Sequence, residues 1–547
     1  MRRIFLYLFL FLFVINIFFV TFAFAQDKQL SLSNQIHNER LGTVNFTVTC
    51  NAQAQQYAVK GLALLHHMTY EGAREAFLEA TKVDADCAMG YWGQAMSFIH
   101  PLWSDMPSEA EFKKGQDLLA LARDRGEKSV LEKAYISAVE AYYAVGRGFN
   151  EKANKASFEK AWYEVYKQFP EDSEAASFYA LAHMATADIA TQGYIKQQRA
   201  AKIAKQVLAR VPDHPGAHHY IIHAYDYPSL AEQAVSVARS YGEITSSVSH
   251  ALHMPSHIFT RLGLWQESIV MNQRAATAAL ESPVSENTIS LHYLHALDYL
   301  VYAYLQRADD AQAEQVLQII KSIDKSVQAH VASAYAFSAV PARLVLERRQ
   351  WAKAAALEVR LPDNYPWDQF PAMEAITHFA RAIGAARSGN KVVAHEALEK
   401  LMTLYDKAKL TSESWAKRVE IHHLSAKAWL IYQMGKPEEA LKVMRQAARL
   451  EAAIEKHPVT PGTILSAREL LADMYLEMGE IKAAQAEYFS VLTHNPNRFN
   501  PLYGVARTAE LVGDNNQAAL YYKKLVDVAV ADSLREQLLH AKNFLEN

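Results

Sequence analysis

The sequence of 547 residues contains few glycines and prolines, 20 and 17 respectively, which disfavours loop-rich all-β folds. It also lacks a charge imbalance, because 56 basic and 59 acidic side chains leave a net charge of -3. No basic run or aromatic-interleaved basic patch is present, so we expect no binding to nucleic acid. There is no Gly-x-Ser-x-Gly elbow, glycine-rich phosphate loop, His-Glu-x-x-His or paired-cysteine zinc pattern. The familiar catalytic signatures are therefore absent.

One long hydrophobic run stands at the N-terminus. Arg2-Arg3 precede an apolar stretch from Ile4 to Phe22. Ala23-Phe24-Ala25 then forms a small-x-small cleavage sequence before Gln26. This pattern predicts a signal peptide over residues 1–25, with an uncleaved membrane anchor as the alternative because the run approaches spanning length. No later stretch is apolar enough to span a bilayer, so we expect an exported mature chain, periplasmic or secreted.

A recurring spacing along the chain indicates helical hairpins. A small residue is followed twelve positions later by alanine, then four on by a bulky residue, and three on by a small or apolar one. Small residues let two helices approach, and the bulky residue fills the groove towards the next hairpin. Strand-like alternation is nearly absent. Regular copies begin at Gly61, Ala382, Ala428, Ala472 and Ala506, and looser ones include Ala231, Ser268 and Ala313.

This pattern, with Pro496 at a turn, resembles the tetratricopeptide repeat. The resemblance covers most of residues 50–545 and implies an all-α, tetratricopeptide-like α-solenoid of antiparallel helix hairpins that form a superhelix. After the signal peptide we expect an N-terminal tail or cap at 26–49, N-terminal repeats with a histidine-rich centre at 50–280, and C-terminal repeats at 281–547. Inserts between hairpins are expected near residues 104–128, 281–288, 361–371 and 456–462.

Cysteine occurs only twice, at Cys50 and Cys87. Each cysteine precedes the first apolar stretch of a predicted helix, and the two helices begin one repeat apart. Neighbouring helix starts can come within bridging distance, and an exported protein meets an oxidising compartment. We therefore predict a structural disulfide rather than two free buried thiols. A redox-active pair would more often read Cys-x-x-Cys.

Histidine, in contrast, is concentrated, with ten of the 22 histidines between His183 and His295. Three dense segments, 218–223, 250–257 and 292–298, lie on predicted first helices of hairpins, which line the groove in tetratricopeptide proteins. Histidines three or four positions apart share a helical face. The repeat frame aligns His250 with His295, and His253 with Asp298 of the next hairpin. Pro255 either kinks the middle helix or starts a new one.

Imidazole is the commonest metal ligand and the usual acid or base near neutral pH. A metal would take its ligands from neighbouring hairpins, with Asp226 and nearby tyrosines behind them. Imidazole and carboxylate ligands suit zinc, copper, iron or nickel. The alternative is a set of core histidines bonded to tyrosines and carboxylates. His66 and His100 either extend the groove chemistry or cap helix ends, and capping is the favoured interpretation. His422 is expected to be solvated or core. The candidate binding residues are His219, His223, His250, His253, His257, His292, His295 and Asp298, and the candidate metal ligands among them are His219, His223, His253, His257 and His295.

The resemblance implies a binding module or scaffold whose concave groove holds a protein, peptide or small ligand. A metal-binding protein or metalloenzyme that uses the central histidines is the alternative, and a purely structural scaffold is the third. The repeat architecture most often serves binding, so an enzyme is the less favoured interpretation. A protein or peptide partner is expected.

Overall fold

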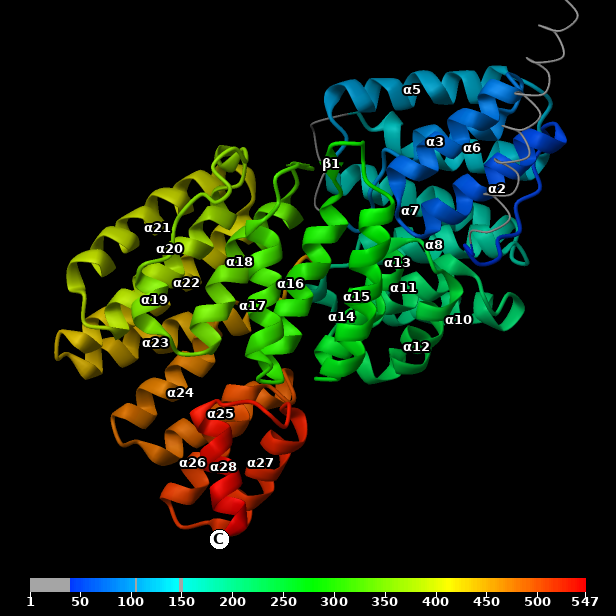
Figure 1. Cartoon of the computed structure of the whole chain (residues 1–547). Helices are drawn as coiled ribbons and strands as arrows, with labels where there is room; N and C mark the ends of the chain where they lie inside the picture. Colours follow the sequence, from blue (N-terminus) through cyan, green and yellow to red (C-terminus); the bar gives the residue numbers. More distant parts are fainter. Residues whose placement is uncertain (1–39, 104–105, 147–150) are drawn as a thin grey trace, which may run out of the picture. The chain divides into compact units, whose positions relative to one another are not determined.

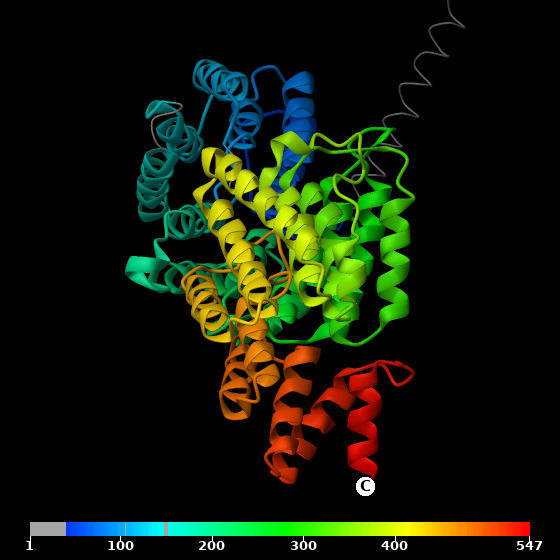
Figure 2. The same ribbon diagram turned by 90° about the vertical axis from the view of Figure 1, so that its left-hand side faces the viewer.

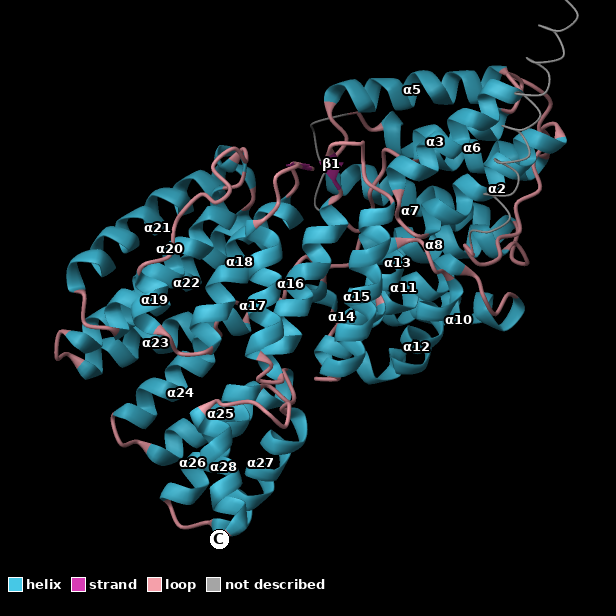
Figure 3. Cartoon of the chain, in the orientation of Figure 1, coloured by secondary structure: helices cyan, strands magenta, loops and turns pink. Residues whose placement is uncertain are grey.

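The computed structural model describes residues 40–103, 106–146 and 151–547. Within these residues nearly all regular structure is helical (Figure 3). A single short sheet pairs β1 (Thr288–Ile289) in parallel with β2 (Ser326–Val327). The predicted signal peptide, and the predicted tail as far as residue 39, lie outside the described residues. No helix in the described part of the chain is both long and apolar enough to cross a bilayer.

The described chain forms two compact units. Unit 1 holds the residues up to Thr186, with 206–216 and 243–247, and unit 2 holds the remainder. The helices of unit 1 are α2 (Ala52–His66), α3 (Tyr70–Val83), α4 (Ala88–Met96), α5 (Glu109–Asp124), α6 (Val130–Ala144), α7 (Glu151–Gln168) and α8 (Ser173–Ala185). The chain passes between the units within α10 (Ile195–Arg210), α11 (Pro215–Tyr225) and α12 (Val235–Ile244).

Unit 2 contains the remaining helices, which follow one another from green to red in Figures 1 and 2. Each hairpin packs against the next in chain order. Its central part consists of α9 (Ile189–Gln192), η1 (Ala231–Ala234), α13 (Ser249–His253), α14 (Pro255–Arg261), α15 (Trp265–Glu281), α16 (Leu291–Gln306), α17 (Asp310–Lys321), α18 (Val331–Glu347) and α19 (Trp351–Ala355). The C-terminal part consists of η2 (Trp367–Gln369), α20 (Pro371–Arg387), α21 (Lys391–Thr411), α22 (Glu413–Gln433), α23 (Pro437–Ala452), α24 (Ala467–Glu477), α25 (Ile481–His494), α26 (Phe499–Leu511), α27 (Asn515–Val528) and α28 (Glu536–Glu546).

The hairpins pack through the small and bulky residues of the repeat. The ring of Phe77 lies between two glycines, so that a Cβ atom would lie 2.9 Å from it at Gly61 and 2.3 Å from it at Gly93. Tyr488 packs in the same way, 2.6 Å from the position of a Cβ atom at Gly504. Contacts this short leave no room for a methyl group, so these glycines set the close approach of neighbouring helices.

The regular repeat positions from Ala382 to Leu525 are buried. Gly435 and Gly479 end the first helices of their hairpins with φ of 78° and 79°, a backbone conformation that favours glycine. Both observations match the spacing from which the hairpins were predicted. The prediction of an all-α, tetratricopeptide-like array of helical hairpins is therefore confirmed.

One of the expected inserts is a helix. Residues 104–128 contain α5, which packs against α4 and α6. Its start is fixed by a capping box, in which Ser108 Oγ accepts a hydrogen bond from the backbone N–H of Glu111 and the Glu111 carboxylate accepts one from that of Ser108. Phe112 and Leu119 face the core. The insert predicted from the sequence thus contains a helix, which the repeat spacing did not indicate.

The described part of the N-terminal segment lies extended along unit 1. Thr49 donates hydrogen bonds from its backbone N–H and its hydroxyl to the Glu132 carboxylate, and the backbone N–H of Asn45 donates to Glu174. Cys50 then joins Cys87 in a disulfide, with the two Cα atoms 4.9 Å apart. The bridge links the segment before α2 to the start of α4.

Candidate metal centre

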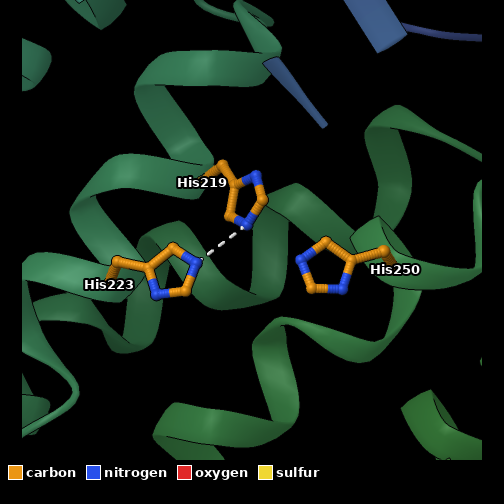
Figure 4. A group of neighbouring side chains, drawn as sticks. All are labelled: His219, His223 and His250. Atoms are coloured by element: carbon orange, nitrogen blue, oxygen red, sulfur yellow. Dashed lines mark hydrogen bonds between the residues drawn. The ribbon is translucent and has the colours of Figure 1, made fainter. Parts of the chain in front are cut away.

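Helix α11 places two histidines on one face, because His219 and His223 are four positions apart. Their Nε2 atoms lie 3.1 Å apart. His250 of α13 completes the group, with its ring centroid 5.1 Å from that of His219. Figure 4 shows the three rings pointing towards one shared space. We call His219, His223 and His250 the α11 triad.

Helices α13 and α14 meet at Pro255, which occupies the first turn of α14. Of the two alternatives left by the sequence, the structure shows a new helix start. Met254 between the helices keeps helical angles, φ -53° and ψ -39°, so the chain continues in the same sense. His253 and His257 therefore lie on the same side, and their Nε2 atoms are 3.1 Å apart.

Helix α16 supplies the third member of this second group. The ring centroid of His295 lies 4.2 Å from that of His253, and the ring centroid of His292 lies 5.2 Å from that of His250. The predicted alignment of His250 with His295, and of His253 with Asp298, is therefore wrong. The observed partners lie three residues, almost one helical turn, earlier in α16. The loop between α15 and α16 absorbs this difference, and loop length does not fix helix register. We call His253, His257 and His295 the α14 triad.

Each triad is compact. One ring nitrogen from each member lies within 4.8 Å of those of the other two. The two triads also adjoin, since the ring centroids of His250 and His253 are 6.3 Å apart and those of His223 and His257 are 6.2 Å apart. All three members of the α14 triad are buried. The structure thus gathers six of the predicted binding residues into one centre.

Burial lowers the pKa of five of these imidazoles and so favours their neutral form near pH 7. It lowers the pKa of His223 to about 3. It also lowers the pKa values of His250, His253 and His295 well below the usual range, and the neighbouring imidazoles add to the effect. For His257, burial lowers the pKa although the Asp226 carboxylate opposes it. A neutral imidazole is the form that binds a metal ion.

Two outer residues, Asp226 and Asn272, fix the tautomers of His257 and His253. Burial alone would raise the pKa of Asp226, but Lys456, Arg261 and His257 together hold it well below its usual value. Asp226 is therefore an ionised acceptor, and His257 Nδ1–H donates to its Oδ2 over 2.9 Å. Asn272 Nδ2 donates to Ser268 O, which turns Asn272 Oδ1 towards His253 Nδ1 at 2.7 Å.

This arrangement leaves both Nε2 atoms without a proton. His253 and His257 each donate from Nδ1, so their Nε2 atoms present lone pairs to each other across 3.1 Å. Two nitrogen ligands of a tetrahedral metal ion, each at about 2.0–2.1 Å, would lie roughly 3.3 Å apart. The geometry therefore suits a shared cation and does not suit a direct hydrogen bond.

A tyrosine closes one side of the α14 triad. The ring centroid of Tyr299 lies 4.5 Å from that of His253 and 5.2 Å from that of His295. Its hydroxyl donates to the carbonyl oxygens of Pro458 and Thr460, each at 3.3 Å. Tyr299 thus connects the triad to the loop that follows α23.

Asp298, a predicted binding residue, lies outside both triads. Its Oδ1 accepts a hydrogen bond from Arg343 Nε over 2.9 Å, and burial raises its pKa although Arg343 opposes the shift. His292, the other predicted residue outside the triads, lies beside His250. Asn272, Arg261 and Lys456 are further partners of the centre that the spacing of the histidines did not indicate. Asn272 stands at the bulky position of a looser repeat copy, four residues after Ser268. A polar residue at a position that is usually apolar was the one sequence sign of its role.

Unit 1 contains a separate buried group. Glu174 Oε2 lies 2.7 Å from His66 Nε2 and 3.1 Å from His214 Nε2. The expectation that His66 caps a helix end is therefore wrong, because its side chain turns inward to Glu174. Since the carboxylate already bonds to both rings, a buried hydrogen-bonded group accounts for this arrangement.

No protein-family model and no curated protein matches the chain. Solved structures with a similar fold include a human IFIT1 dimer with PPP-AAAA, with 13% identity, 87% of this chain and 91% of that chain covered, and a TM-score of 0.36. A tetratricopeptide repeat protein from Parabacteroides merdae is 11% identical over 76% of this chain and 98% of its own, with a TM-score of 0.23. Naa15/Naa10 bound to HypK-THB is 12% identical over 90% of this chain and 73% of that chain, with a TM-score of 0.25. These low scores carry no inference about binding or activity, and the fold assignment rests on the packing of the hairpins.

Proposed function

We propose that this chain is a metal-binding protein whose unit 2 holds one transition-metal ion at the α14 triad and a second at the α11 triad. The observation that carries the proposal is the pair of Nε2 atoms of His253 and His257, which face each other at 3.1 Å while both Nδ1 atoms donate elsewhere. A cation between them removes the repulsion of the two lone pairs.

The ligand chemistry narrows the metal. Both triads consist of imidazoles alone, and the carboxylate of Asp226 stands behind His257. Such sets suit zinc, copper, iron or nickel, whereas calcium and magnesium prefer oxygen ligands. Because the imidazoles are already neutral, metal binding would displace few protons at pH 7. Asp226 and Asn272 would hold the rings in the binding orientation.

Calorimetric titration of untagged, chelator-treated protein with Zn²⁺ and Cu²⁺ tests this function. We expect saturable binding of up to two ions per chain. The double variant His253→Gln/His257→Gln should lose binding at the α14 triad. His422→Gln is the matched control, because His422 is a histidine of unit 2 that stacks on Phe379 and belongs to neither triad. Equal binding by the two variants would remove the proposal.

Two earlier expectations remain separate proposals. Export would be supported by a mature N-terminus at Gln26 in protein from the exported fraction, and an intact Met1 there would contradict it. A groove that holds a protein or peptide partner is expected from the repeat resemblance. It would be supported by a partner that co-purifies at fixed stoichiometry.

A further inference from the structure

Unit 2 contains a cavity of 370 Å³ beside the α14 triad. Its walls come from α14, α20, α22, α23 and the loop between α23 and α24. This volume lies within the usual range of small-molecule sites, about 300–1,000 Å³. Ile376, Ile421 and Ile464 give one part of the wall an apolar character.

Positive charge exceeds negative charge on the polar wall. The wall contains four cations, Arg261, Arg418, Lys456 and Arg468, and two carboxylates, Glu451 and Glu455. Arg261 lies 4.0 Å from Glu455, and Arg468 pairs with Glu487. Asp226, which does not line the cavity, lies 2.8 Å from Arg261 Nε and 3.3 Å from Lys456 Nζ. Arg418, also of the wall, bonds to Ser414 and to the backbone oxygen of Glu455 and makes no carboxylate ion pair within the described residues. An anion that entered the cavity would complete this charge balance.

An aromatic surface lies next to Arg418. The ring centroids of Trp415 and His457 are 4.4 Å apart, and the guanidinium carbon of Arg418 lies 5.3 Å from the Trp415 ring. His457 Nδ1 accepts a hydrogen bond from the backbone N–H of Val459 over 3.2 Å, so its Nε2 carries the proton. The wall therefore offers a planar stacking surface beside hydrogen-bond donors.

Two side chains, Asp226 and Tyr299, connect residues of the cavity wall with the α14 triad. Asp226 accepts hydrogen bonds from Lys456 and from His257 Nδ1. The Tyr299 ring contacts His253, and its hydroxyl bonds to the Thr460 carbonyl of the cavity loop. These two side chains therefore link the cavity wall to the imidazoles.

We propose that this cavity binds a small organic oxyanion, a carboxylate or phosphate attached to an apolar or aromatic body. Arg418 and Lys456 bind the oxyanion, and Trp415 and the isoleucines contact the body. The site does not depend on metal binding, because no member of either triad lines the cavity. Ligand in the cavity would contact Lys456 and Thr460, which bond to Asp226 and Tyr299 next to the triad.

Calorimetric titration of the full chain with benzoate, phenyl phosphate and neutral benzamide tests the proposal. We expect saturable binding of benzoate or phenyl phosphate, and at least tenfold weaker binding of benzamide, since charged hydrogen bonds contribute about tenfold to hundredfold in affinity. The preferred anion distinguishes a carboxylate site from a phosphate site. Equal affinity for benzamide, or no saturable binding of either anion, would overturn it.

Variants locate the binding. Arg418→Gln should weaken the preferred anion about tenfold or more, and Arg418→Lys should restore part of the affinity. Arg239→Gln is the matched control, because Arg239 pairs with Glu267 on the surface, outside the cavity wall. An Arg418→Gln protein with unchanged affinity and an unchanged circular dichroism melt would contradict the site. Repeating the titration with metal-free His253→Gln/His257→Gln separates the two proposals, since anion binding should persist there.

Discussion

His253 and His257 lie on either side of a helix break at Pro255, yet their Nε2 atoms are 3.1 Å apart. The chain keeps its helical course across the break because Met254 has helical backbone angles. Asn272 and Asp226 hold the opposite ring nitrogens, so both lone pairs point inward. This pair of facing, unprotonated nitrogens is the feature of the α14 triad that suits a metal ion.

Replacing the outer partner of His253 should weaken metal binding without removing a ligand. In Asn272→Ala the His253 ring loses the acceptor that fixes its tautomer, and we expect about 10–100-fold lower metal affinity. Competition with a chromogenic chelator measures this. Asn154→Ala is the matched control, because Asn154 is a buried asparagine of unit 1 that donates to the Tyr142 carbonyl. A similar loss in the control would show a general effect of stability.

Acid should destabilise the metal-free protein. His223 and His422 have pKa values of about 3 in the folded chain because of burial. The unfolded pKa is about 6.5, so between these values the unfolded chain binds more protons. The free energy of unfolding is then fully present above about pH 6.5 and falls as pH decreases, by up to about 1.4 kcal/mol per pH unit for each such histidine.

Urea unfolding of metal-free protein at about pH 7, 6 and 5 checks this slope. His422→Leu removes one of the titrating groups and should make the slope shallower by up to about 1.4 kcal/mol per pH unit. A free energy of unfolding that does not change between about pH 7 and 5 would contradict this, since it would show that the folded chain binds as many protons as the unfolded chain.

Alanine substitutions should have opposite effects at a glycine that contacts Phe77 and at one that does not. Gly93→Ala would place a Cβ atom 2.3 Å from the Phe77 ring, and overpacking of this kind costs about 1–3 kcal/mol. Gly72→Ala meets only ordinary contacts, 3.5 Å from Thr69, and lies within α3. It should raise the free energy of unfolding by roughly 0.5–1 kcal/mol. Thermal unfolding ranks the two, and the reverse order would refute the packing.

The bridge between Cys50 and Cys87 closes a loop with a sequence separation of 37. Loss of the bridge should cost about 3–4 kcal/mol, chiefly through the greater entropy of the unfolded chain. Chemical denaturation of the wild type with and without reductant measures this cost. The double variant Cys50→Ala/Cys87→Ala should not respond to reductant. Unchanged stability of the reduced wild type would count against a structural role.

The sequence predicted the hairpins because packing leaves a local record. Gly61, Phe77 and Ala80 stand at spacings that later hairpins repeat, and the structure buries all three residues as expected. Helix α5 was missed because it falls outside that spacing, although the Ser108–Glu111 capping box was visible in the sequence.

The candidate site was predicted in composition but not in register. His219 and His223 could be paired from their spacing on one helix, whereas the contact of His253 with His295 depends on how α16 stacks. Asn272 is a polar residue at a bulky repeat position, but its role could not be assigned from the sequence, since it depends on the side of α15 that faces α13. Residues distant in sequence, such as Lys456, meet the centre only through tertiary packing.

Elemental analysis of untagged protein, purified without chelators, tests the central claim most directly. We predict at least one zinc, copper, iron or nickel ion per wild-type chain, a lower metal content in His253→Gln/His257→Gln, and wild-type content in His422→Gln. Trace metal in the wild type that does not rise after incubation with Zn²⁺ or Cu²⁺ would contradict the account.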